Sequence, residues 1–171
     1  MKTKVINYEN LFNLFVLKIK QDNRDLLKHP FKQKDRYYAT DAQSLIYMSV
    51  KKIKLPFSEQ KQPECFRVIP KQTVKLAIPV FILKEKLSLK RIREPGGKVF
   101  DNKIPFSIYG TIYYYNQLIR LLKAAKITDT DTIYQMSEIK EGANIFKLNN
   151  GISVLVAYAI PKLTEEPIKI I

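Results

Sequence analysis

Three charged residues near the end of the chain have the types and spacing that a metal-dependent nuclease uses. Glu138-Ile139-Lys140 places an acid two residues before a lysine on a predicted strand, and Asp129 or Asp131 lies upstream. The carboxylates would hold a divalent cation, and the lysine would stabilise charge developing on a phosphate. The spacing from Asp131 is short, and these acids lie in the least basic part of the chain. Phosphodiester hydrolysis is therefore an alternative function.

The other residue types that carry catalysis form no recognisable site. His29 is the single histidine and stands beside Pro30 in a polar stretch, with no Gly-x-Ser-x-Gly turn for a nucleophile. Cys65 is the single cysteine and lies in an apolar patch, so we expect an inert buried thiol. The sequence has no glycine-rich phosphate-binding pattern and no Cys/His metal cluster. We expect a protein that is not an enzyme and that uses neither a metal nor a cofactor.

The charged residues are distributed unevenly. The 171 residues include 30 Lys and Arg against 16 Asp and Glu, a net charge of +14. Residues 1–126 hold 26 basic and 10 acidic residues, whereas residues 127–171 hold 4 and 6. An AT-rich genome also produces a lysine excess together with abundant Ile, Asn and Tyr, but the asymmetry favours a basic face. Such a face suits nucleic acid, because Lys and Arg neutralise phosphates and release counterions.

Two segments concentrate the basic residues. A helix predicted at residues 116–126 has an apolar stripe formed by Leu118, Ile119, Leu122 and Ala125. Its opposite, solvent-facing side carries basic residues spaced by three, namely Arg120, Lys123 and Lys126. Residues 84–98 form a second basic run, which reads as a solvated loop or a hairpin tip. Its basic residues are Lys84, Lys86, Lys90, Arg91, Arg93 and Lys98.

The aromatic residues allow a further alternative. Tyr113-Tyr114-Tyr115 could stack the bases of single-stranded nucleic acid if the rings were exposed. Tyrosines at a junction between a strand and a helix more often pack in the core or at its rim. Single-strand binding is therefore a second alternative.

The elements that must position these residues follow the order strand, helix, strands, and then the same order again. Asn7 is the expected N-cap of a helix at residues 9–20, and Asp41-Ala42-Gln43 is the expected turn between two strands. Strands are predicted at residues 2–6, 36–41, 44–50, 65–69, 74–83, 99–109, 132–137, 144–148 and 152–159. Short hairpins favour an antiparallel α+β fold with two main helices over a parallel sheet.

The length of the chain suits one domain with a packed core. We expect this domain at residues 1–161, with halves at about 1–70 and 71–161, a basic insertion near 84–98 and a C-terminal tail at 162–171. The apolar runs are too short to span a bilayer, and no N-terminal apolar stretch precedes a small-residue cleavage site. We expect a cytoplasmic protein with no membrane partner.

The order of elements and several short motifs resemble one domain of a bacterial DNA sliding clamp, the beta subunit of DNA polymerase III. In the first half, a strand ending in Ala39-Thr40-Asp41 turns into a strand that begins near Leu45. In the second half, a helix contains Leu121-Leu122-Lys123, and Asn149-Asn150-Gly151 leads to a strand that closes at Ile160-Pro161. The likeness covers residues 1–54 and 99–161, and the order of elements carries more of it than the residue matches.

The resemblance implies a non-enzymatic processivity factor of DNA replication. Its helices would face duplex DNA and bind it without sequence preference, and its partners would be DNA, polymerase-type proteins and further copies of itself. By position, the resemblance assigns DNA contacts to Arg120, Lys123 and Lys126, with Lys18 and Lys20 as the basic end of the first helix. The cations of residues 84–98 are possible additional contacts. Clamp peptide grooves lie between two domains, so no residue here is assigned to that role.

Overall fold

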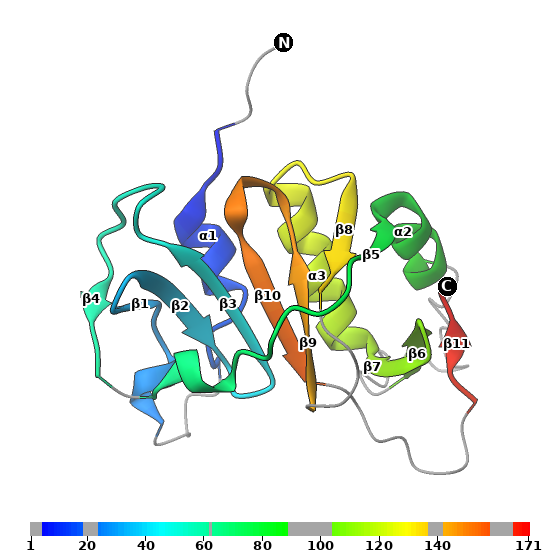
Figure 1. The fold of residues 1–171 in the computed structure, drawn as a ribbon, viewed down its shortest axis with the longest axis horizontal. Helices are drawn as coiled ribbons and strands as arrows, with labels where there is room; N and C mark the ends of the chain where they lie inside the picture. The colour runs from blue at the N-terminus through cyan, green and yellow to red at the C-terminus, as the bar shows by residue number, and fades with distance from the viewer. Residues whose placement is uncertain (1–4, 19–23, 62, 89–103, 137–141, 158–165) are drawn as a thin grey trace, which may run out of the picture.

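The computed structural model describes residues 5–18, 24–61, 63–88, 104–136, 142–157 and 166–171 (Figure 1). The first half holds one helix and four strands: α1 (Tyr8–Asn13), β1 (Phe31–Gln33), β2 (Arg36–Thr40), β3 (Ser44–Ser49) and β4 (Ser58–Glu59). The remainder begins with β5 (Leu76–Pro79), α2 (Val80–Ser88), β6 (Pro105–Ile108), β7 (Thr111–Tyr114) and α3 (Tyr115–Ile127). It ends with β8 (Thr132–Gln135), β9 (Ala143–Lys147), β10 (Ser153–Ala157) and β11 (Ile168–Lys169).

The strands form a large sheet and a small one. The eight-stranded sheet has the order β4-β1-β2-β3-β10-β9-β8-β5, and the three-stranded sheet has the order β11-β6-β7. Strands β1, β2 and β3 are mirrored by β8, β9 and β10, and the antiparallel pair of β3 and β10 joins the two sets at the centre. The predicted α+β fold, with two similar halves and mainly antiparallel sheets, is confirmed; β4 and β11 alone pair in parallel among the described strands.

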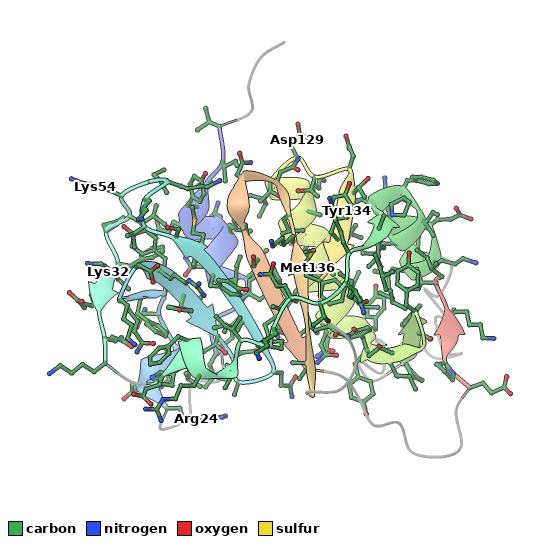
Figure 2. All side chains as sticks on the ribbon, viewed as in Figure 1. Arg24, Lys32, Lys54, Asp129, Tyr134 and Met136 are labelled. Atoms are coloured by element: carbon green, nitrogen blue, oxygen red, sulfur yellow. The ribbon has the colours of Figure 1, made fainter. Side chains whose placement is uncertain are left out.

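One face of the large sheet is crossed by a segment that we call the strap, residues 63–75. Figure 1 shows it running in front of the strands toward β5. The Gln33 side-chain amide donates to the backbone oxygens of Gln60, Lys61 and Pro63, which anchors the chain where it enters the strap. At the other end the Thr73 N–H donates to the Met136 carbonyl at 3.0 Å, near the centre of Figure 2. The strap covers a small core of Phe31, Tyr38, Leu45, Tyr47, Cys65, Ile145 and Leu155.

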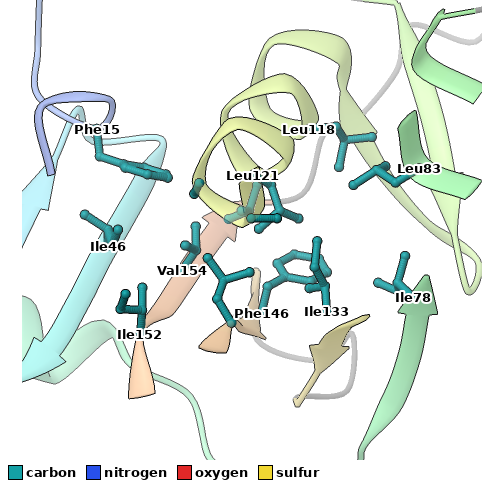
Figure 3. Close-up of a cluster of buried hydrophobic side chains, with 14 of the residues drawn as sticks. Phe15, Ile46, Ile78, Leu83, Leu118, Leu121, Ile133, Phe146, Ile152 and Val154 are labelled. Atoms are coloured by element: carbon teal, nitrogen blue, oxygen red, sulfur yellow. The ribbon is translucent and has the colours of Figure 1, made fainter. Parts of the chain in front are cut away.

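The opposite face of the large sheet carries the helices and the main core. Phe15 follows α1, Leu83 lies on α2 and Leu121 on α3, and all three are fully buried in one cluster (Figure 3). The strands contribute the alternate side chains that point to this face, such as Ile46 and Val154. Both helices that the sequence predicted therefore lie on one side of the sheet, and α2 joins them there.

The helix predicted at residues 9–20 is shorter in the structure. The Asn7 side chain caps it as expected, accepting the Asn10 N–H at 2.9 Å, but α1 ends at Asn13. Beyond the helix the Leu17 N–H donates to the Leu27 carbonyl at 2.8 Å, so the chain is drawn into a loop contact. The strand predicted at residues 2–6 lies largely outside the described residues.

Two further segments differ from the prediction for identifiable reasons. The strand expected at residues 65–69 is the 3-10 helix η2 (Cys65–Val68), because this part of the strap lies across the sheet face rather than at an edge. Residues 80–88 form α2 instead of a strand and a loop. The run Val80-Phe81-Ile82-Leu83 reads as a strand, but Leu83 and Leu87 are buried one helical turn apart.

The last residues also take part in the fold. Residues 162–171 were expected to be a tail, yet β11 pairs in parallel with β6, and Ile170 is buried. Among the described residues, no helix is long and apolar enough to cross a membrane.

Candidate functional site

Helix α3 is the central element of the candidate site. It begins where the Gln117 side-chain oxygen accepts the Tyr114 N–H at 2.9 Å, and it ends where the Thr128 hydroxyl donates to the Ala124 carbonyl at 2.9 Å. Its buried residues are Gln117, Leu118, Leu121, Ala124 and Ala125. Leu118 and Ala125 of the predicted stripe are buried, but Ile119 and Leu122 are only half-buried, and Leu121 and Ala124 face the core in their place.

The basic row predicted on this helix is divided. Lys123 and Lys126 are exposed, as expected for the side away from the core. Arg120 lies at the margin of the buried face, because successive helical residues are rotated by about 100°. Its guanidinium donates to the carboxylate of Asp41, and its side chain is only 30% exposed. Arg120 thus contacts another element of the protein, and Lys123 and Lys126 are the exposed members of the row.

The remaining basic residues named from the sequence fall in several places. Lys18 is exposed, but it lies beyond the end of α1 rather than on it. On α2, Lys84 is exposed and Lys86 is half-buried. The others lie outside the described residues: Lys20, Lys90, Arg91, Arg93 and Lys98.

Asp41 is the carboxylate that holds the turn between β2 and β3. It is almost buried, and one of its oxygens accepts the backbone N–H groups of Gln43 at 3.0 Å and Ser44 at 2.8 Å. Ala42 within this turn has a φ of 73°, a left-handed conformation that is uncommon for a residue other than glycine. The carboxylate supports this turn from inside, and its second oxygen faces Arg120.

A pocket of about 590 Å³ lies on the strap side of the sheet, at the end where this turn is located. The turn and the neighbouring strand ends form one wall, and the strap forms the other through Cys65 and Val68. Arg24, at the bottom of Figure 2, also lines it. The Ser44 hydroxyl in its wall is buried and has no hydrogen-bond partner among the described residues. Burial raises the pKa of the Cys65 thiol to about 11, so the thiol is unreactive at neutral pH.

The described residues include only part of the alternative nuclease site, together with the tyrosines of the single-strand alternative. Asp129 and Asp131 are exposed, and Figure 2 shows Asp129 at the top end of the molecule. Glu138 and Lys140 lie outside the described residues, within which no group of three His, Cys, Asp or Glu could hold a metal ion. Tyr113, proposed to stack bases, is fully buried.

Sequence reasoning did not identify the pocket or the pairing of Arg120 with Asp41. The two residues are 79 positions apart, and no local pattern connects them. The one available signal was the turn Asp41-Ala42-Gln43, in which an aspartate can bond backbone N–H groups two and three residues ahead.

The arrangement of two mirrored half-sheets with helices on one face can be compared with known structures. DNA polymerase III subunit beta from Pseudomonas aeruginosa superposes with a TM-score of 0.62 at 12% identity, over 92% of this chain and 65% of that one. This chain has the fold of a bacterial DNA polymerase III beta subunit. A beta subunit from Eubacterium rectale gives a TM-score of 0.55 at 10% identity, over 94% of this chain and 65% of that one.

The beta-subunit resemblance predicted from the sequence is thereby confirmed at the level of the fold. The chain spans less than two thirds of the length of either beta subunit. No protein-family model matches the sequence, and no curated protein matches it significantly.

Proposed function

We propose that the chain is a non-enzymatic accessory subunit of the clamp type, which holds duplex DNA without sequence preference and works with a polymerase. The observation that carries the proposal is the beta-subunit fold over more than nine-tenths of the chain. The solved structures that share it are subunits of DNA polymerase III by name. The net charge of +14 favours association with a polyanion such as DNA.

We assign the DNA contact to the helix layer of the molecule. Lys123 and Lys126 extend from the outer side of α3, and Lys84 is exposed on α2, which packs against α3. Lysines at such positions bind phosphates as point charges, so they hold the backbone without reading the bases. Lys18 and Lys86 are secondary contacts in this proposal, and so are the basic residues of the run that continues beyond α2.

The double variant Lys123→Gln/Lys126→Gln tests this assignment. Binding of a fluorescein-labelled duplex, followed by anisotropy at several salt concentrations, should weaken about tenfold at low salt. The dependence of log affinity on log salt should become less steep by about 2, one for each lysine that no longer neutralises a phosphate. Two duplexes of unrelated sequence should behave alike.

A matched control uses two exposed lysines of the strap, on the other side of the sheet. Lys71→Gln/Lys75→Gln removes the same charge, and its binding should stay close to that of the original chain. Equal losses in both double variants would contradict the helix-layer assignment and leave only a general charge effect. Cleavage of the duplex in Mg²⁺ that disappears on Glu138→Gln would instead support the nuclease.

The pocket beside the Asp41 turn supports a second part of the role, the docking of a polymerase-type partner. Its volume of about 590 Å³ is within the range of about 300–1,000 Å³ of typical ligand pockets. Val68, which is 60% exposed, provides apolar surface, whereas Leu45, Leu155 and the Ser44 hydroxyl are buried within the wall. We therefore assign to it a short peptide segment with apolar side chains from the partner.

Selection from a random peptide library displayed on phage tests this assignment. Peptides that bind the original chain should carry apolar residues and should lose binding to Val68→Glu. Val68 is 60% exposed and lines the pocket, so this change should place a negative charge in the pocket without unfolding the chain. The control is Val5→Glu, because Val5 is 92% exposed and is not part of the pocket. Peptides that bind both variants equally would show that the pocket is not the docking site.

A further inference from the structure

Arg120 is the member of the predicted basic row that is bound within the protein. Its guanidinium donates to one oxygen of Asp41, whose side chain is 7% exposed, against 30% for Arg120. A carboxylate so deeply enclosed needs a positive partner, since an unpaired buried charge is strongly unfavourable. The Arg120 guanidinium therefore neutralises the charge of Asp41 rather than that of a ligand in solvent.

Asp41 in turn stabilises the backbone of the turn between β2 and β3. Its other oxygen accepts the N–H groups of Gln43 and Ser44, which fixes the turn around Ala42. A left-handed alanine is strained, and such a conformation persists only where its surroundings hold it. Removing Arg120 would favour rotation of the carboxylate toward water and would release both N–H groups.

A second link joins α3 to the same wall. The Gln117 side-chain amide donates to the Ala157 carbonyl at 3.0 Å, and the Ala157 N–H donates to the Gln43 carbonyl at 3.1 Å. Gln117 and Arg120 are three residues apart, so they stand next to each other along the helix. Helix α3 thus holds the turn from Asp41 and the end of β10 from Ala157.

The residues held in this way line the pocket. Ala42, Gln43, Ser44 and Ala157 all contribute to its wall. We propose that Arg120 is a positioning residue for this pocket, acting through Asp41, rather than a DNA contact. The inference rests on the proposed docking role of the pocket for its biological meaning, while the physical link itself can be measured without a partner.

Cys65 provides the measurement, because it lines the pocket and is the single cysteine of the chain. The probe is the thiol reagent DTNB, whose reaction with Cys65 depends on opening of the pocket wall. Arg120→Gln should raise the rate about tenfold, since loosening of the turn increases the open population. Its affinity for the labelled duplex and its salt dependence should remain within about twofold of those of the original chain.

Two controls separate positioning from its alternatives. Lys123→Gln on the same helix should weaken DNA binding and leave the DTNB rate unchanged. Ile170→Ala removes a buried side chain that does not line the pocket. It shows how much the DTNB rate rises from general destabilisation alone. Urea denaturation gives the free energy of unfolding of each variant, with which its DTNB rate can be compared.

Two outcomes would overturn the inference. One is that Arg120→Gln weakens DNA binding as Lys123→Gln does, with the DTNB rate unchanged. The other is that its DTNB rate follows its unfolding equilibrium as in Ile170→Ala. If Arg120→Gln does not fold, Asp41→Ala removes both the partner of Arg120 and the acceptor of the two N–H groups, and it should give at least the same rise in rate. Failure of the original chain to bind duplex or peptides would overturn the proposed function and leave the DTNB comparison readable.

Discussion

Tyr113 is one of the largest fully buried side chains, and its hydroxyl is enclosed with it. The ring stands nearly edge-on to Phe146, with centroids 5.6 Å apart, and the hydroxyl accepts a hydrogen bond from the Asn144 side-chain amide. Burial raises the pKa of Tyr113 to about 12, because the phenolate would lose its hydration, and the hydrogen bond only partly offsets this. Tyr113 therefore makes the free energy of unfolding depend on pH in the alkaline range.

We predict that Tyr113→Phe reduces the loss of stability at alkaline pH. Below about pH 10 the phenol is neutral in both states, whereas between about pH 10 and 12 the unfolded chain releases its proton and the folded chain keeps it. The free energy of unfolding therefore falls as pH rises, by about 1 kcal/mol at pH 11 from this residue. Urea denaturation of both proteins at about pH 8 and pH 11 should show that extra loss only with Tyr113 present. Equal losses would show that the phenol is not shielded.

At the scale of elements, the C-terminal strand β11 extends the smaller sheet. It pairs with β6, the Ile170 N–H donates to the Ser107 carbonyl at 2.8 Å, and the Ile171 carbonyl accepts the Tyr109 N–H at 3.1 Å. The Ile170 side chain is 6% exposed and joins the main core, whereas that of Ile171 is 41% exposed. Ile170 and Ile171, which directly follow β11, thus face opposite environments.

We predict that Ile170→Ala destabilises the protein by about 2–4 kcal/mol, because it removes buried methyl groups and leaves a cavity. Ile171→Ala should change the free energy of unfolding by no more than about 0.5 kcal/mol. Urea denaturation of the two variants provides the comparison. Similar effects for both would mean that β11 does not anchor the end of the chain.

The elements that the sequence predicted well have signals within a few residues. The turn of Asp41 between β2 and β3, the N-cap Asn7 and the body of α3 are of this kind. Helix α2 was missed because its four consecutive apolar residues have no helical period, and only the main core decides that Leu83 and Leu87 are the buried pair. The candidate site divides in the same way. The spacing along the helix predicted that Lys123 and Lys126 are exposed, whereas the role of Arg120 depends on Asp41, which is distant in the sequence.

At the scale of the whole molecule, the two halves are alike in topology and in net charge, but their helices are unlike in charge. Helix α1 has six residues with no Lys or Arg, whereas α3 has thirteen and carries Lys123 and Lys126 outward. Lys18, expected to extend the basic face from α1, lies past the end of that helix. The proposed DNA contact is therefore centred on the second half.

The net charge of +14 acts on folding and on binding in opposite directions. Like charges repel one another in the compact state, and salt screens this repulsion, since the Debye length shrinks from about 30 Å at 0.01 M to about 8 Å at 0.15 M. Salt also competes with the lysines for phosphate, because binding depends on counterion release. We predict that the free energy of unfolding in urea rises with NaCl over this range while affinity for duplex DNA falls.

The lysine variants can separate the salt dependence of stability from the salt dependence of DNA binding. Lys123→Gln/Lys126→Gln and Lys71→Gln/Lys75→Gln remove equal charge, so both should make stability less dependent on salt, by similar amounts. The helix pair alone should also make DNA binding less dependent on salt, because contact with phosphate requires position whereas self-repulsion depends on total charge. If stability were independent of salt in the original chain, its basic residues would be too widely spaced to repel.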